Sequence, residues 1–182
     1  MMSNNVIPDK GPADAFPWYR KAALKGHPMA MHSLGLCYYK GIGIDRPDLD
    51  TALEWFDKAA KQNITESMSY MARVYLQLMM THVEQIETAQ QHFAKAVQWL
   101  KKAAEKEDAY ALRELGKIYL SGKGLKADYT IAFNLLQKAS QKNDPEAIAF
   151  LGDCYHKGTG TEKNLEIAVE HYLRSASLGY PL

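Results

Sequence analysis

One nine-residue pattern recurs five times along this chain at intervals of about 36 residues, and it constrains the fold more than any other feature. Each copy begins with alanine, carries large side chains at its fourth and fifth positions, and ends with a basic residue and two small ones. The copies begin at Ala15, Ala52, Ala96, Ala132 and Ala168. A fixed period between about 20 and 50 residues is typical of stacked supersecondary units. The sequence therefore predicts a repeat array.

A second pattern follows four of the copies and predicts a second helix in each unit. It reads Leu34-Gly-x-x-Tyr38 in the first unit and recurs at residues 71–75, 115–119 and 151–155. Apolar residues in both patterns fall at helical spacing, so each copy is predicted to be a helix A followed by a helix B. Gly-x-Gly at 41–43, 122–124 and 158–160 allows a tight reversal into the next helix A.

Taken together, Ala-x-x-Trp-x-x-Lys-Ala-Ala, Leu-Gly-x-x-Tyr and Gly-x-Gly resemble the Sel1-like repeat, a relative of the tetratricopeptide (TPR-like) repeat. The resemblance implies an all-α fold, a right-handed α/α superhelical solenoid of about four to five helix-turn-helix repeats. It also implies a concave face that binds protein partners. The second unit departs from the pattern because it lacks both turn glycines, and the fifth has His171 where three others have tryptophan.

The repeats set the expected domain organisation. Residues 1–12 are expected to form a flexible N-terminal arm, and residues 13–182 the solenoid. The units are expected at about 13–49, 50–93 with an insertion at 78–95, 94–129 and 130–165, with a partial unit at 166–182.

Bulk composition argues against several classes of partner. The formal net charge is +1, from 22 basic and 21 acidic residues, so no dominant electrostatic attraction to nucleic acid is expected. No apolar stretch approaches the roughly 18 residues of a membrane span, and residues 1–10 do not read as a signal peptide. Cys37 and Cys154 lie far apart in the array and are expected to be buried free thiols. These features suit a cytoplasmic protein.

Small residues at fixed repeat positions are expected to let helices A and B approach closely, because a larger side chain would force them apart. The positions expected to be structural are Ala22, Ala59, Ala103, Ala139, Gly35, Gly116, Gly152, Tyr38, Tyr75, Tyr119 and Tyr155.

The second unit is longer than the others, since the spacing between Ala52 and Ala96 is 44 residues. The added stretch has no glycine or proline, and its apolar residues step by three and four. We expect helix B to run to about Met80 and the third helix A to begin near Thr81, as a protruding helical corner. Its apolar residues Met79, Met80, Val83 and Ile86 either pack within the corner or bind a partner.

Residues that vary on the polar side of helix A are candidates for partner specificity, because packing does not dictate them. They are Arg20, Glu54, Asp57, Gln98, Lys101, Asn134 and Gln137. The tryptophans at 18, 55 and 99 are either partner anchors or repeat packing. The basic residue before the paired small residues either binds an acidic partner or lies on a solvated face.

No motif in the chain predicts chemistry. The six histidines form no metal-ligand spacing, and there is no nucleophile elbow. We therefore predict a non-enzymatic adaptor or scaffold with no cofactor, no metal and no catalytic residue. It would bind a protein or peptide, for example as an immunity-type protein or an adaptor in a bacterial secretion or envelope system. An RNA-binding helical repeat and an enzyme without a recognisable motif are the alternatives. Self-association through the C-terminal helix is a further expectation.

Overall fold

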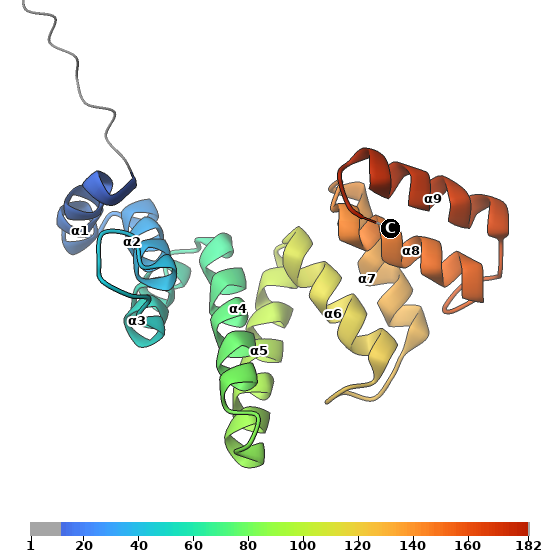
Figure 1. The fold of residues 1–182 in the computed structure, drawn as a ribbon, viewed down its shortest axis with the longest axis horizontal. Coiled ribbons are helices and arrows are strands. Elements are labelled where there is room, and N and C mark those ends of the chain that lie inside the picture. Colours follow the sequence, from blue (N-terminus) through green and yellow to red (C-terminus); the bar gives the residue numbers. More distant parts are fainter. Residues whose placement is uncertain (1–11, 182) are drawn as a thin grey trace, which may run out of the picture. The chain divides into compact units, whose positions relative to one another are not determined.

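The computed structural model describes residues 12–181, and within this range it has nine α-helices and no strand (Figure 1). A 3-10 helix, η1 (Pro12–Ala15), precedes them. The α-helices are α1 (Phe16–Leu24), α2 (Pro28–Lys40), α3 (Leu49–Ala60), α4 (Thr65–Thr81), α5 (Ile86–Glu105), α6 (Ala109–Ser121), α7 (Tyr129–Gln141), α8 (Pro145–Lys157) and α9 (Leu165–Ser177). The predicted all-α class is confirmed. The predicted N-terminal arm lies outside the described residues except for Pro12, where η1 begins.

The odd-numbered α-helices carry the first repeated pattern, and the even-numbered ones carry the second. Local side chains start many of them. Asp48 and Asp128 accept the backbone N–H groups of Thr51 and Ile131 at the first turns of α3 and α7. Asn164 does the same at α9. Such caps satisfy donors that have no partner inside the helix.

A residue with positive φ separates each helix A from the next element. Asn63 and Asn143 have φ of 65° and 58°, and Glu107 takes φ of 57° at the equivalent place. Asparagine tolerates this left-handed conformation better than glutamate does. The position is therefore enforced by the fold even where the side chain is poorly suited.

Glycines on the B helices make room for one large side chain of the following helix A. A Cβ on Gly116 would stand 2.8 Å from Cγ of Leu136, and one on Gly35 would stand 2.7 Å from the Phe56 ring. The expected close approach is therefore present. Its partner is this large side chain, whereas the sequence pointed to the paired alanines.

The chain divides into two compact units, with the boundary between Val74 and Tyr75 inside α4. In the first unit, Leu34 and Ala59 are fully buried, and buried His32 is hydrogen-bonded to Ser67 at 2.9 Å. In the second, fully buried Leu136 lies in a cluster with Leu112, Ala139, Ala147, Leu151 and Cys154. The expected repeat boundaries stay predictions.

The insertion forms a hairpin between α4 and α5, and here one detail of the prediction is wrong. Helix α4 ends at Thr81, close to the expected Met80, but α5 begins at Ile86, with a turn at residues 82–85. Thr81 does not cap α5, because its hydroxyl donates to the Leu78 carbonyl at 2.9 Å. The His82 backbone N–H donates to the same carbonyl. Both bonds close α4 before α5 starts.

Candidate functional site

A groove of about 840 Å³ lies on the second unit, and we name it the corner groove. Three walls enclose it, from the end of α4 with the following turn, from one face of α5, and from the loop between α6 and α7. Its lining residues are Met79, Val83, Ile86, Ala89, Gln90, Phe93, Ala94, Val97, Gln98, Lys101, Lys123, Gly124 and Leu125. Nine of these thirteen residues are apolar or glycine, and the other four are Gln90, Gln98, Lys101 and Lys123.

The α5 wall exists because the insertion lengthens this helix to 20 residues. Ile86, Gln90, Phe93, Val97 and Lys101 are spaced by three or four, so they lie along one face. The half-buried Phe93 ring occupies the place where a Cβ on Gly124 would stand. Gly124, with φ of 75°, thereby brings the α6–α7 loop against α5 and closes the third wall.

The hairpin has one packed side and one open side. On the packed side, the His92 ring stacks on Tyr75 at 6.1 Å between centroids and lies 5.4 Å from the ring of His82. On the open side, Val83 is 67% exposed and Ile86 is 70% exposed. The two extensions therefore pack on each other and also present apolar surface, and partner binding by these residues stays a prediction.

The charged residues that line the groove are both cations. Lys101 comes from the C-terminal half of α5, and Lys123 comes from the α6–α7 loop. Neither takes part in an ion pair with any residue that the structure describes. Of the described lining residues, none is acidic. The described lining of the groove therefore carries positive charge and no negative charge.

The sequence-predicted candidates divide between this groove and other surfaces. Five of them line the corner groove together: Met79, Val83, Ile86, Gln98 and Lys101. Exposed Met80 lies beside the groove in sequence but does not line it. Asn134 and Gln137 are exposed on α7.

The remaining candidates belong to the first unit. Glu54 is exposed on α3, and half-exposed Asp57 pairs with Lys61 one turn later at 2.5 Å. Arg20 lines a separate hollow on α1 with Phe16 and Leu24. The first-unit candidates therefore lie outside the corner groove and stay predictions.

Sequence reasoning missed Phe93, Lys123 and Leu125 as lining residues. The sequence did contain a signal for Phe93, which is an aromatic residue three positions before Ala96. Tyr129 is an aromatic residue at the equivalent position before Ala132. The loop residues could not be found, because they meet α5 only through the tertiary fold.

In two of the repeats, the lysine that precedes the paired small residues lies over the tryptophan of the same helix. The ammonium of Lys58 lies 4.1 Å from the ring centroid of Trp55, and that of Lys102 lies 4.2 Å from Trp99. These are cation–π contacts. The Lys58 ammonium therefore lies over an aromatic ring of its own helix.

The positions expected to be structural lie mostly inside. Six of the seven alanines and glycines are buried, namely Ala59, Ala103, Ala139, Gly35, Gly116 and Gly152, and the seventh, Ala22, is half-buried. The four tyrosines, Tyr38, Tyr75, Tyr119 and Tyr155, are half-buried. Tyr38 and Tyr155 each meet the ring of a phenylalanine edge-on, Phe16 and Phe133 respectively.

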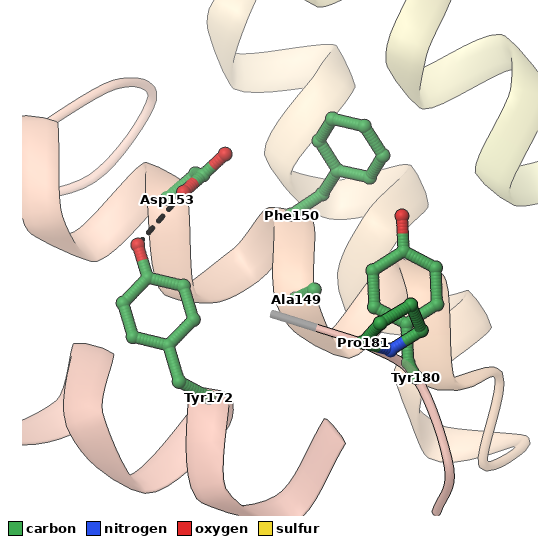
Figure 2. A pocket seen from close by; sticks show the side chains of 6 residues that line it. All are labelled: Ala149, Phe150, Asp153, Tyr172, Tyr180 and Pro181. Atoms are coloured by element: carbon green, nitrogen blue, oxygen red, sulfur yellow. Dashed lines mark hydrogen bonds between the residues drawn. The ribbon is translucent and has the colours of Figure 1, made fainter. Parts of the chain in front are cut away.

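A second, smaller hollow of about 380 Å³ lies between α8 and α9 (Figure 2). The Tyr172 hydroxyl donates to Asp153 at 2.7 Å, and Tyr180 lies near Phe150. Burial, the hydrogen bond to Asp153 and the charge of that carboxylate raise the pKa of Tyr172 to about 12. Tyr172 is half-buried, because its ring packs over Gly152 as Phe56 packs over Gly35.

Leu173, by contrast, is 65% exposed, and Leu165 and Val169 extend the same stripe along α9. Self-association through this helix stays a prediction. Light scattering of the wild type and of Leu173→Glu over a range of concentrations tests it, since association through this stripe would be lost in the variant.

Two other kinds of site are absent from the part of the chain that the structure describes. Between residues 12 and 181, no group of three or more histidine, cysteine or carboxylate side chains is placed to hold a metal ion. Over the same residues, no helix has the length and apolar character needed to cross a bilayer.

Comparison with known proteins connects this geometry to a family. The model of the Sel1 repeat matches residues 6–27, 28–64, 90–108, 109–144 and 145–180. The matches leave out residues 65–89, which contain α4, the turn and the start of α5. One wall of the corner groove thus lies outside the matched repeats.

Individual relatives show the same repeat in different proteins. The chain is 32% identical over 108 residues to chitin synthase regulatory factor 3 of Schizosaccharomyces pombe, covering 58% of this chain and 11% of the relative. It is 33% identical over 106 residues to the ERAD-associated E3 ubiquitin-protein ligase component HRD3B of Arabidopsis thaliana, covering 58% of this chain and 15% of the relative. The chain thus spans a small part of these curated relatives.

A solved structure supports the fold over nearly the whole chain. The crystal structure of a Sel1 repeat protein from Oxalobacter formigenes is 36% identical and superposes with a TM-score of 0.78. The match covers 93% of this chain and 65% of that protein. The helix pairs described above are therefore those of a Sel1-repeat solenoid.

Proposed function

Because this chain belongs to the Sel1-repeat family, we propose that it is a non-enzymatic adaptor that binds a protein or peptide partner. Proteins built from helical repeats are extended scaffolds, and the repeat array presents long surfaces for binding. In this chain the structural repeat positions are buried or half-buried, whereas the variable positions Gln98, Lys101, Asn134 and Gln137 are exposed. A partner has access to the residues that packing leaves free.

The observation that carries this proposal is the composition of the corner groove. The sequence selected candidates by two separate arguments, from the apolar residues of the insertion and from the variable polar positions. Residues from both selections line the corner groove. An exposed apolar surface rimmed by polar residues is typical of interaction sites. This favours the groove over the polar positions of the first unit as the main contact surface.

The relatives' names concern regulation and membership of a ligase complex, and both are compatible with an adaptor. An immunity-type protein that holds a toxin and an adaptor in a secretion or envelope system are narrower versions of this proposal. Each predicts a different captured protein.

We also propose that the chain is cytoplasmic, because its two free buried thiols are compatible with a reducing environment.

The test is a pull-down from the source cell's lysate with the tagged full chain. The corner variant, Val83→Glu with Ile86→Glu, introduces charge at two exposed apolar positions. A matched control, Met29→Glu, makes the same change at an apolar residue of α2 that is 60% exposed. We expect one stoichiometric protein to be retained by wild type and control and lost by the corner variant.

A second variant, Glu54→Lys with Asp57→Lys, tests the first-unit candidates. Loss of the partner in this variant alone would move the contact surface to α3. Absence of any stoichiometric protein with the wild-type chain would contradict the adaptor proposal.

A further inference from the structure

The corner groove has the length of a helix of moderate size. Its α5 wall runs from Ile86 to Lys101, which is about 22 Å at 1.5 Å per residue. An occupant helix that follows this wall would have about 15 residues, or four turns. Ala89 and Ala94 line the wall, and their small side chains allow a neighbouring helix to approach to the usual 8–10 Å between axes.

The groove also favours a helix over an extended segment. Peptides that bind as strands need a sheet edge with unpaired backbone groups. This groove is lined by two helices and a glycine loop, and no strand occurs between residues 12 and 181. An occupant must therefore satisfy its own backbone hydrogen bonds over the apolar floor, which an α-helix does.

The two ends of the groove differ in chemistry. Met79, Val83 and Ile86 form an apolar end at the hairpin turn, and methionine adapts to partners of varied shape. Phe93 and Val97 continue the apolar floor along α5. Lys101 lies at the other end of the α5 wall, and Lys123 lies beside the loop glycine that packs on Phe93.

The charge of the lining residues specifies the partner further. Both charged lining residues are lysines, and neither is paired with a described carboxylate. Complementary charge across an interface steers association and sets orientation. The occupant should carry aspartate or glutamate at the positions that meet Lys101 and Lys123.

Resting on the proposed function, we infer that the corner groove binds an amphipathic α-helix of a partner protein that has an apolar face flanked by carboxylates. Its apolar side chains lie on Phe93, Val97 and the hairpin turn, and its carboxylates meet Lys101 and Lys123. Because residues 65–89 lie outside the family matches, the wall that provides the apolar end belongs to this chain's own insertion.

Selection from a displayed library of random peptides of about 16 residues, with the full chain as bait, tests this inference. We expect enriched peptides to repeat apolar residues at intervals of three and four and to carry Asp or Glu beside that apolar face. Fluorescence anisotropy of a selected peptide should show about tenfold or greater weakening with the Ile86→Glu chain. Circular dichroism should show that the peptide gains helix on binding.

Charge reversal supplies the second readout. Lys101→Glu with Lys123→Glu should weaken the acidic peptide about tenfold and reduce its salt dependence. A peptide with its carboxylates changed to lysines should then bind this variant better than it binds the wild type. Lys106→Glu with Lys163→Glu, a matched reversal at exposed residues outside the groove, should leave the affinity unchanged.

The inference is overturned if no peptide is enriched, if enriched peptides bind Ile86→Glu as well as wild type, or if they are basic or remain non-helical. The outcomes separate the two proposals. A lysate partner that survives the corner variant would leave the adaptor function standing and remove the helix-binding groove. Absence of any lysate partner would reject the adaptor function itself.

Discussion

At the scale of single residues, the positions most sensitive to change are glycines whose missing side chain leaves space for a large side chain of another helix. Gly35, Gly116 and Gly152 each face a large side chain of the next helix A. Leu136, opposite Gly116, is fully buried. The protein interior is close-packed, so a side chain added there has no space to enter.

Gly116→Leu is expected to lower the free energy of unfolding by about 1–3 kcal/mol through overpacking against Leu136. Ala103→Phe, at a fully buried position of α5, should have a similar effect. Thermal melts followed by circular dichroism measure both. Gln137→Leu adds a comparable side chain at an exposed site of α7 and should change the midpoint little. An unaltered midpoint for Gly116→Leu would reject the packing argument.

His92 should make stability depend on pH. Burial lowers the pKa of His92 below 6.5, and the nearby His82 and Lys95 lower it further. The folded state therefore favours the neutral ring. This contribution to stability is present above pH 6.5 and is lost as the pH falls through the lowered folded-state pKa.

Urea denaturation between pH 8 and pH 5 checks this expectation. The wild type should lose more stability on acidification than His92→Gln, and the difference between them should stay constant above about pH 7.5. Equal pH profiles for the two proteins would show that His92 does not contribute.

At the scale of helices, ionic contacts join α6 to α8. The Arg113 guanidinium lies 2.7 Å from Asp144 and 3.2 Å from Glu146, and Lys117 lies 2.6 Å from Glu146. Asp144 also caps α8 by accepting the Ala147 backbone N–H. One carboxylate thus starts a helix and fixes it to its neighbour.

Arg113→Met should cost about 1–3 kcal/mol of stability, because it leaves the poorly exposed carboxylate of Asp144 without its charged partner. Chemical denaturation measures the loss. Lys157→Met removes a cation from a pair with Asp153 that is 4.0 Å long and exposed, so it should cost much less. Equal effects of the two changes would mean that the α6–α8 contact contributes no more than a surface pair.

The helices themselves were predictable from sequence where the determining interaction is local. Asp128 caps a helix whose first residues follow it directly, and the Gly122 turn needs positive φ at that residue. The start of α5 was not predictable in this way. The Thr81 hydroxyl can either cap α5 or bond to the end of α4, and in the structure it donates to the Leu78 carbonyl of α4.

The groove was predictable only in part for a related reason. Its α5 face follows from periodicity, but its third wall depends on Gly124 meeting Phe93, 31 positions earlier in the chain. No pattern within a repeat reports that contact. The Arg113–Asp144 pair was missed for the same reason, since both residues read from sequence as ordinary polar positions.

At the scale of the whole molecule, the contacts divide the chain at Val74 and Tyr75. Repeat proteins have stabilities that are roughly sums over units and neighbouring interfaces, so different regions open with different free energies. A destabilising change in one unit should therefore act mainly within that unit.

Hydrogen exchange of Gly35→Leu tests this. The substitution crowds the Phe56 ring, and we expect faster exchange of amides in α2 and α3 than in wild type, with a smaller change in α7 and α8. Gly116→Leu should give the opposite distribution. Uniform acceleration across residues 12–181 in both variants would show that the chain unfolds as one cooperative body.

Cys37 and Cys154 are both buried free thiols, and one lies on each side of the boundary at Val74. Burial raises the pKa of both, that of Cys154 to about 11, so neither reacts readily while its surroundings stay closed. Each of the two compact units thus contains one thiol that can report local opening. The rate at which an alkylating reagent modifies each thiol reports how often that part of the chain opens, without any added label.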